Sequence, residues 1–309
     1  MSTSPHTSQS ATNAIQVASL HVYPLKGAAG FSPHSCPVDE RGLRHDRRFM
    51  LVDETGNFIS QRTCAKLALV RADIANTTLR LYCPARAAPH SPRTEAAIVH
   101  ADLRVCEIAL DTLAANTPQN ESEYARVQVW NDFVQALAIW PEVDAALSEF
   151  LGQACRLVWM PDSATRLTNI NRGEPRRNVS FADAAPLLLT SETSLQELNA
   201  RLQAGGSAAI PMDRFRANIV IRGAALAEDD HWSALTINKA KFRASNSCKR
   251  CKVITIDQTT GEFQSRDPVI TLATYRSDGN SVTFGQHLLV ERSGMLSVGD
   301  RVVVDASHR

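Results

Sequence analysis

Short apolar segments divide the second half of the chain and constrain its fold more than any other feature. Turn residues separate five such runs between residues 215 and 304: ANIVIRG, ALTINKAKFRA, KVITID, HLLVE and RVVVD. Segments of this length, rich in valine, isoleucine and leucine, are typical of strands in a β-barrel or sandwich. The sequence therefore predicts an α+β, β-rich fold, with a β-barrel and flanking helices in the second half.

The first half contains an extended segment and a hairpin. IQVASLHVYPL, from Ile15 to Leu25, has the β-branched, alternating pattern of a strand, and Lys26 would lie at its end. RRFMLVDETGNFISQR, residues 47–62, is two apolar runs around a turn, the strongest hairpin pattern in this half. We expect Arg47 and Arg62 at the same open end of this hairpin. These segments predict a β-rich first half.

Two helices are predicted from their end signals. PEVDAALSEFLG, residues 141–152, begins with proline, has apolar side chains at helical spacing and ends with glycine. SETSLQELNARLQAGG, residues 191–206, has a serine cap and a double-glycine end. We expect the first helix to open a second domain, which divides the chain into a disordered tail (1–14), a first domain (15–140) and a second domain (141–309). The proline-rich segment 83–94 is predicted to be a surface loop.

Composition limits the classes of protein and partner. The 309 residues can form two domains, and 33 basic against 32 acidic residues leave a net charge of +1, too little to attract nucleic acid or an acidic membrane. The sequence has neither an apolar run long enough to span a membrane nor an N-terminal secretory pattern, so a cytoplasmic protein is expected. The seven cysteines are spread thinly and are predicted to be free thiols, most of them buried.

One cysteine pair stands apart from the others. In SNSCKRCKVITID, Cys248 and Cys251 have basic neighbours at positions 249, 250 and 252. A structural zinc site needs about four ligands, and the chain has no second such pair. A thioredoxin-like pair normally begins a helix, whereas Cys251 leads into a strand predicted at residues 253–256. Two thiols without a chemical role remain an alternative, but the basic neighbours favour the thiolate, the form that attacks or binds a soft metal.

Charged residues also stand near the ends of the predicted strands. Lys26 follows the first strand, Asp46 and Arg47 precede the hairpin, and Arg62 follows it. Each of these alone is more often a solvated charge than a ligand. Arg216, in DRFRANIVIRG, differs because it precedes a strand with a buried pattern, where an unpaired guanidinium would be costly. We expect a fixed anion or carboxylate beside it.

A further polar group precedes the apolar run in RRNVSFADAAPLLLTSE. It contains Arg176, Arg177 and Asp183. Taken alone, this pattern indicates a polar loop that leads into a core strand.

Six motifs, in their order, resemble one family. They are VYPLKG, GLRHDRRFMLVDETGNFISQR, VSFADAAPLLLTSETSL, DRFRANIVIRGAALAEDDHWSALTI, CKRCKVITIDQTTGE and FGQHLLVERSGMLSVGDRV. Together they are similar to a two-part MOSC protein, in which a MOSC N-terminal β-barrel domain precedes the domain named after molybdenum cofactor sulfurase. The resemblance covers residues 15 to about 305. Within the family, the chain most resembles the mitochondrial amidoxime-reducing component and bacterial relatives that reduce N-hydroxylated bases.

The resemblance implies a molybdenum cofactor. In the family, molybdenum is bound by molybdopterin and by the second cysteine of the pair, which makes Cys251 the expected metal-binding and catalytic residue. The expected cofactor-binding residues are those that match the family's motifs, with Asp183 near the pterin edge: Lys26, Arg47, Asp183, Arg216 and Asn218. Gly27 stands where the family often has serine and keeps only a backbone contact. Lys249 adds a charge that would touch the cofactor or narrow the mouth of the site.

The resemblance also implies a reaction and its partners. A molybdenum-dependent reductase would convert N-hydroxylated bases or amidoximes, with the oxygen leaving as water. The sequence lacks the cysteine spacing of a fused iron–sulfur domain, so electrons are expected from a separate ferredoxin, flavodoxin or reductase-like protein. No nucleic-acid polymer and no membrane are expected as partners. The alternatives are sulfur transfer through a persulfide on Cys251, for which the pyridoxal-phosphate domain of the sulfurases is absent, and a cofactor carrier. The role of Cys248 stays open between packing and a place beside the metal.

Overall fold

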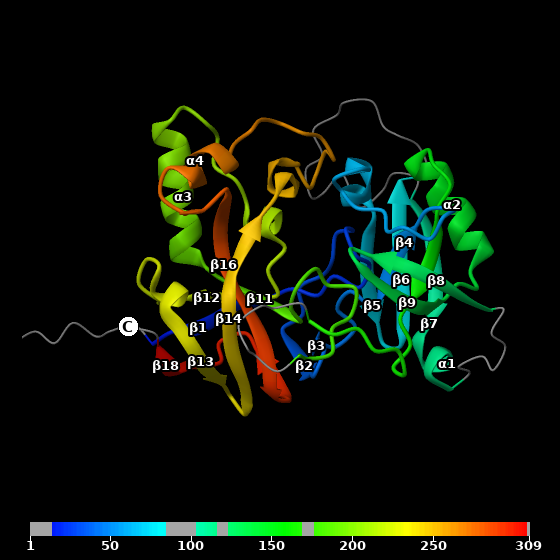
Figure 1. Cartoon of the computed structure of the whole chain (residues 1–309), viewed down its shortest axis with the longest axis horizontal. Coiled ribbons are helices and arrows are strands. Elements are labelled where there is room, and N and C mark those ends of the chain that lie inside the picture. The colour runs from blue at the N-terminus through cyan, green and yellow to red at the C-terminus, as the bar shows by residue number, and fades with distance from the viewer. Residues whose placement is uncertain (1–13, 85–102, 116–122, 169–175, 308–309) are drawn as a thin grey trace, which may run out of the picture.

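The computed structural model describes residues 14–84, 103–115, 123–168 and 176–307. Figure 1 shows two β-rich lobes side by side. We call them the eight-stranded lobe, which carries helices α3 and α4, and the four-stranded lobe, which carries α1 and α2. The β-rich α+β class predicted from the sequence is confirmed.

The eight-stranded lobe is built on one curved sheet. Its strand order is β1 (Gln16–Leu20), β12 (Ile219–Arg222), β11 (Leu187–Ser191), β16 (Ser281–Arg292), β14 (Ala240–Arg250), β13 (Trp232–Ile237) and β18 (Val302–Ser307), with β15 (Ser277–Asp278) beside β16. Only β11 and β12 pair in parallel among the ladders of this sheet in the described ranges. Val17 N–H donates to Asp300 O at 2.9 Å, and Val302 N–H donates to Ile15 O at 2.8 Å. These bonds bring the two ends of the sheet together, as a barrel requires.

Helix α3 (Glu192–Ala204) covers one side of this lobe beside α4 (Val269–Ala273). Ser191 Oγ accepts the Ser194 N–H at 3.1 Å, so the predicted cap is confirmed. Apolar side chains of α3 pack with buried residues of the short helix η4 (Met212–Phe215) and of β16 in one cluster: Leu198, Leu202, Phe215 and Phe284. A second 3₁₀ helix, η5 (Glu228–His231), precedes β13.

The four-stranded lobe contains the sheet β4 (Phe49–Val52), β10 (Arg156–Trp159), β9 (Asp132–Leu137) and β8 (Tyr124–Val129). Beside it lie the strands β5 (Arg71–Ala75), β6 (Thr78–Pro84) and β7 (Leu103–Ala109), with α1 (Leu110–Ala115) and the 3₁₀ helix η1 (Ala65–Leu69). A small sheet between the lobes pairs β17 (Gly294–Ser297), β2 (Ser35–Asp39) and β3 (Gly42–Leu43).

The predicted helix at residues 141–152 and the turn of the predicted hairpin are confirmed in this lobe, but the second arm of the hairpin is not a full strand and pairs with β4 through the isolated bridge Val52–Phe58. Asp53 Oδ1 accepts the backbone N–H groups of Thr55 and Asn57, which closes the turn after β4. Helix α2 (Pro141–Leu151) ends at Gly152, which has a left-handed φ of 73°. Its apolar face packs in the same core as β4 and β10. Strand β1, from the start of the chain, joins the other lobe, and the domain boundary at residues 140/141 stays a prediction.

Two predicted strands differ from the structure. The first strand ends at Leu20 rather than Leu25, because the chain then changes partners: the carbonyls of Tyr23 and Pro24 accept the N–H groups of Arg47 and Phe49. Lys26 therefore lies beyond the strand. The predicted strand 253–256 is wrong, since residues Lys252–Thr255 form the 3₁₀ helix η6. Ile254, within this short helix, is buried in the apolar core below the end of strand β14.

The remaining predictions concern a loop, the termini and the cysteines. Cys83 and Pro84, placed in the predicted loop, complete strand β6, and residues 85–94 lie outside the described residues, as do residues 1–13. All seven cysteines are free, and only Cys106 and Cys251 among them are half-buried rather than buried, so the prediction of thiols is confirmed. In the described part of the chain, no helix is long and apolar enough to cross a membrane.

Candidate functional site

A cavity of about 370 Å³ lies between the two lobes. The four-stranded lobe and the segments beside it contribute Lys26, Gly27, Arg47, Phe58, Gln61, Arg62 and Trp130, and the eight-stranded lobe contributes Phe215, Arg216, Asn218, Cys248, Lys249, Arg250, Cys251 and His287. Asp183 lies in the loop that leads into β11. The structure therefore brings every residue that the sequence predicted for the site to one cavity. Their roles remain predictions.

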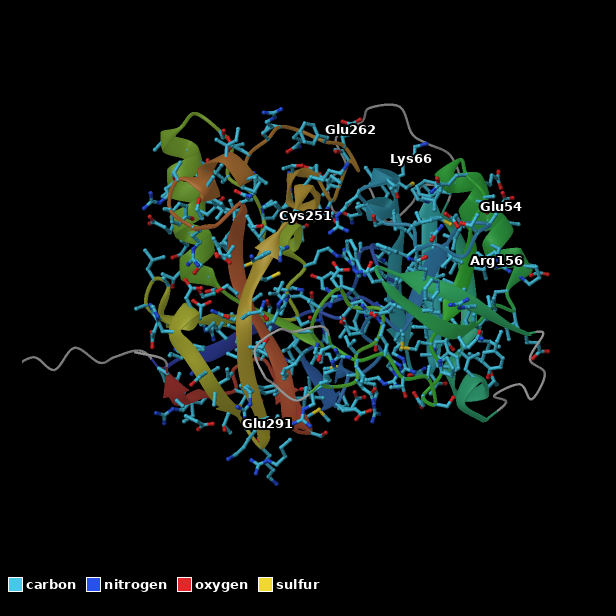
Figure 2. All side chains as sticks on the ribbon, viewed as in Figure 1. Glu54, Lys66, Arg156, Cys251, Glu262 and Glu291 are labelled. Atoms are coloured by element: carbon cyan, nitrogen blue, oxygen red, sulfur yellow. The ribbon has the colours of Figure 1, made fainter. Side chains whose placement is uncertain are left out.

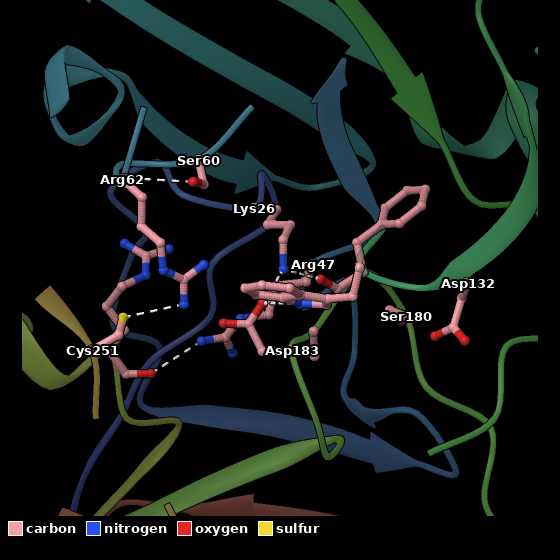
Figure 3. Close-up of polar contacts among 12 residues, drawn as sticks. Lys26, Arg47, Ser60, Arg62, Asp132, Ser180, Asp183 and Cys251 are labelled. Carbon is pink, nitrogen blue, oxygen red and sulfur yellow. Dashed lines mark hydrogen bonds and ion pairs between the residues drawn. The ribbon is translucent and has the colours of Figure 1, made fainter. Parts of the chain in front are cut away.

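Lys26 and Asp183 form an ion pair on the cavity wall (Figure 3). Lys26 is 6% exposed and also donates to Phe181 O at 2.7 Å. The Asp183 side chain is 59% exposed, since it faces the open cavity. Desolvation by the cavity wall opposes its charged form, but the charge and hydrogen bond of Lys26 prevail and hold the pKa of Asp183 well below its usual range. Asp183 is therefore ionised at neutral pH.

Two arginines stack on one buried tyrosine. The guanidinium carbons of Arg47 and Arg216 lie 4.8 and 4.3 Å from the centre of the Tyr23 ring. Arg47 donates to the Arg216 carbonyl at 3.0 Å and pairs with Asp46, which is 2% exposed. Both arginines have a left-handed φ, 49° and 54°, which is strained for residues with a side chain and typical of functional sites.

Arg216 retains hydrogen-bonding capacity at the cavity. Its Nη2 is buried and has no hydrogen-bond partner within the ranges that the structure describes. Burial lowers the pKa of Arg216 to about 10, and the charge of Arg47 acts in the same direction, although Tyr23 opposes it. A bound anion would satisfy this nitrogen and offset the repulsion between the two guanidinium groups. The expectation of an anion beside Arg216 therefore has a structural basis.

The Asn218 side chain makes its hydrogen bonds with other groups of the protein. Its Oδ1 accepts the Arg47 guanidinium at 2.9 Å and the Leu188 N–H at 3.2 Å, and its Nδ2 donates to His21 O at 3.2 Å. The residue is 1% exposed. Asn218 thus orients Arg47 and joins the segments around β1, β11 and β12.

Cys251 follows strand β14 and caps helix η6, at the cavity between the lobes (Figure 2). It is half-buried, and its sulfur accepts a hydrogen bond from Arg62 Nη2 at 3.1 Å (Figure 3). The Arg62 guanidinium lies 4.6 Å from the Trp130 ring centre, and Trp130 Nε1 donates to Asp183 Oδ1 at 3.1 Å. Arg62 lines the same cavity as Arg47.

Sequence reasoning missed Trp130. The residue stands in the turn between β8 and β9 with a left-handed φ of 56°, and its side chain is 39% exposed. A tryptophan in a turn is the available sequence signal, but no pattern connects it with an aspartate that lies 53 residues away along the chain.

Cys248 has a different environment from Cys251. It is 8% exposed, packs in an apolar cluster with Leu188 and Val220, and its sulfur accepts Arg250 Nη1 at 2.9 Å. Burial opposes the thiolate, but the charges of Arg250 and His287 and their hydrogen bonds lower the pKa of Cys248 to about 6. Cys248 is therefore a packed residue whose environment favours the thiolate, and whether it has a role beside a metal stays open.

Gly27 and Lys249 have distinct positions at the cavity. Gly27 has a φ of 85°, and a Cβ atom there would lie 2.6 Å from Leu67 Cδ2, so the backbone favours glycine over serine. Its carbonyl accepts Gln61 Nε2 at 2.7 Å. The Lys249 side chain is 59% exposed and pairs with Asp278 at 3.3 Å. Lys249 lies at the rim of the cavity.

Comparison with known proteins identifies two domains in the chain. Residues 14–154 match the MOSC N-terminal beta barrel domain, and residues 176–303 match the MOSC domain. The chain is 30% identical to mitochondrial amidoxime reducing component 2 of Rattus norvegicus over 93% of its own length and 82% of the relative's.

Two further relatives are mitochondrial amidoxime-reducing component 1 of Mus musculus and a molybdenum cofactor sulfurase of Oryza sativa subsp. japonica. The first is 29% identical over 93% of this chain and 81% of the relative, and the second is 29% identical over 91% of this chain. The chain spans only 33% of the length of that sulfurase. From the two domain matches and the rat relative, the chain belongs to the MOSC family, with the MOSC N-terminal β-barrel domain preceding the MOSC domain.

Proposed function

We propose that this protein is a molybdenum-dependent reductase of N-hydroxylated compounds, such as N-hydroxylated bases and amidoximes, with molybdenum held by molybdopterin and the Cys251 thiolate. The proposal is carried by one observation: a half-buried cysteine shares a cavity with Arg216, whose buried Nη2 lacks a partner in the described residues. The similarity to two amidoxime-reducing components over most of their length supports the same reaction class.

The residues of the cavity fit this cofactor. Arg216 Nη2 and Arg250 Nε are both buried without a partner among the described residues, and the acceptor oxygens of a phosphate would satisfy such groups. Lys26 and Arg47 add positive charge on the same wall. The soft sulfur of Cys251 is a suitable ligand for molybdenum. When bound, the cofactor would supply the two-electron chemistry that, with two protons, converts N–OH into N–H and water.

The chain itself would orient the substrate. The Asp183 carboxylate is ionised, faces the cavity and is fixed by Lys26 and Trp130, so it can accept a hydrogen bond from the substrate's N–H or O–H group. The exposed Trp130 ring offers an apolar surface beside it. We propose a cytoplasmic protein that receives electrons from a separate ferredoxin, flavodoxin or reductase-like partner.

Metal and pterin analysis tests this proposal. Wild-type protein and Cys251→Ala are purified from a host that makes molybdopterin, with Cys106→Ala as control, since Cys106 is the other half-buried cysteine of the chain and lies on β7. We expect molybdenum and pterin in near-equal amounts in the wild type and the control, and loss of molybdenum in Cys251→Ala. Wild type should then reduce benzamidoxime and hydroxylaminopurine with a chemically reduced viologen dye.

Two results would contradict the proposal. Wild-type protein without molybdenum and pterin would exclude the reductase, and mass spectrometry should then look for a persulfide on Cys251. Full molybdenum content in Cys251→Ala would show that this thiolate is not the ligand.

A further inference from the structure

Arg62 contacts the sulfur of Cys251 from the opposite lobe. Arg62 lies after the hairpin in the MOSC N-terminal domain, whereas Cys251 lies in the MOSC domain. We propose that Arg62 is a positioning residue that sets the charge around the Cys251 sulfur and, through it, the reduction potential of molybdenum bound there. The second part of this statement rests on the proposed function.

The Arg62 guanidinium is held in place by an aromatic ring. Its carbon lies 4.6 Å from the centre of Trp130, and Phe58 supports the same ring at 5.0 Å between ring centres. Trp130 is fixed in turn through Nε1, which donates to Asp183 at 3.1 Å. Stacking on a ring leaves the edge N–H groups of a guanidinium free to donate, and here one of them reaches Cys251 Sγ at 3.1 Å.

Two other cations near Cys251, Arg250 and Lys249, make contacts elsewhere. Arg250 donates to Cys248 Sγ at 2.9 Å and to Phe215 O at 2.8 Å. Lys249 points to Asp278 at the rim. Of these three cations, Arg62 is the one that donates to the Cys251 sulfur, and it comes from a different domain.

A hydrogen bond and a positive charge at a thiolate ligand reduce the electron density that the sulfur gives to its metal. Such contacts to a metal-bound sulfur shift reduction potentials, and a contact that withdraws charge favours the reduced metal. Loss of Arg62 should therefore move the potential to more negative values. Molybdenum in the variant would take electrons less readily from a weak donor.

The first test is a redox titration of the loaded protein, followed by the electron-paramagnetic-resonance signal of Mo(V). It compares wild type, Arg62→Gln and Arg62→Lys at equal molybdenum content. The control is Arg71→Gln, because Arg71 also stacks on an aromatic ring, Tyr82 at 4.3 Å, but lies outside the cavity lining. We expect a more negative potential in Arg62→Gln, a partial return in Arg62→Lys and no change in Arg71→Gln.

The second test needs no cofactor. In the metal-free protein, the rate at which Cys251 reacts with anionic iodoacetate is divided by the rate with neutral iodoacetamide. The ratio cancels the reactivity of the thiol itself and reports the local positive charge. We expect Arg62→Gln to lower this ratio several-fold, with Arg62→Lys close to wild type and Arg71→Gln unchanged.

The two tests separate this inference from the proposed function. If the wild type carries no molybdenum, the proposed function fails, and the ratio still decides whether Arg62 sets the charge at Cys251. If the wild type carries molybdenum but Arg62→Gln leaves the potential unchanged, the link to the metal is wrong. An unchanged ratio in Arg62→Gln would overturn the inference as a whole.

Discussion

The two walls of the cavity are held in place by different means. The inner wall, made of Phe215, Cys248, Arg250 and His287, comes from the eight-stranded lobe alone, and Phe215 stacks on Phe284 in its core at 3.9 Å between ring centres. The outer wall, made of Arg62, Trp130, Asp183 and Cys251, joins both lobes, and its Trp130 and Asp183 are 39% and 59% exposed. The inner wall is therefore fixed by folding of one core, whereas the outer wall depends on how two domains meet.

The largest expected effect concerns packing, which should contribute more to stability on the inner wall than on the outer wall. Phe215 is fully buried, so Phe215→Ala should lower the free energy of unfolding by about 3–5 kcal/mol, because it removes a large side chain and leaves a cavity. Trp130→Ala on the outer wall should cost less, about 1–2 kcal/mol, since the exposed ring loses its contacts with Phe58 and Arg62 and its hydrogen bond to Asp183. Urea unfolding of the metal-free variants measures both values. Equal losses would remove the distinction between the walls.

Asn218 tests the buried hydrogen bonds that connect the segments behind the two walls. Asn218→Ala removes three side-chain contacts, to Arg47, Leu188 and His21, and leaves buried groups without partners. We expect a loss of about 2–3 kcal/mol in the free energy of unfolding. Asn218→Asp keeps the oxygen that accepts from Arg47 and Leu188, so its loss should be smaller. If the aspartate variant is the less stable of the two, the acceptor oxygen is not the important atom.

The two walls also differ in how much of their structure can be predicted from the sequence. The anion expected beside Arg216 followed from one local conflict, a guanidinium next to a buried strand, and in the described part of the chain the Arg216 Nη2 has no hydrogen-bond partner. The caps at Ser191 and Gly152 were likewise predictable, because they depend on neighbouring residues. The contact of Trp130 with Asp183 was not, since it depends on the docking of two domains.

The error at residues 253–256 has a similar origin. KVITID alternates as a strand does, but burial of Ile254 under the end of β14 favours a 3₁₀ turn there. A short apolar run does not itself reveal which period the packing will use. Cys251 consequently caps a helical turn that faces the other lobe, and this position allows its sulfur to meet Arg62.

The charge on the inner-wall thiol should appear in the pH dependence of stability. The pKa of Cys248 is lowered to about 6 against an ordinary value of 9.0, because Arg250 and His287 outweigh burial. Its contribution is therefore complete above pH 9 and is lost as the pH falls to about 6. Between these values, the unfolding free energy of wild type minus that of Cys248→Ala should rise with pH by at most about 1.4 kcal/mol per unit.

Cys36 provides the control for this titration. Burial raises the pKa of Cys36 to about 11, so its thiol stays neutral in the folded protein where that of Cys248 ionises. The difference between wild type and Cys36→Ala should be flat from pH 6 to near 9 and should fall above that range. Urea unfolding of reduced, metal-free protein measures both series. A flat series for Cys248→Ala would show that its sulfur is not charged.

The smallest expected effect is at the rim, next to the outer wall. Lys249 is 59% exposed and pairs with Asp278 at 3.3 Å, and exposed ion pairs of this kind contribute little to stability. Lys249→Gln should change the free energy of unfolding by less than about 0.5 kcal/mol and leave the molybdenum content at the wild-type level. The sequence placed Lys249 among the cofactor-binding residues or at the mouth of the site, so loss of molybdenum in this variant would support the cofactor-binding role. If Lys249→Gln keeps its molybdenum, the lysine acts only at the mouth of the cavity. Its charge should then appear as a change in the KM for substrate that becomes smaller at high salt.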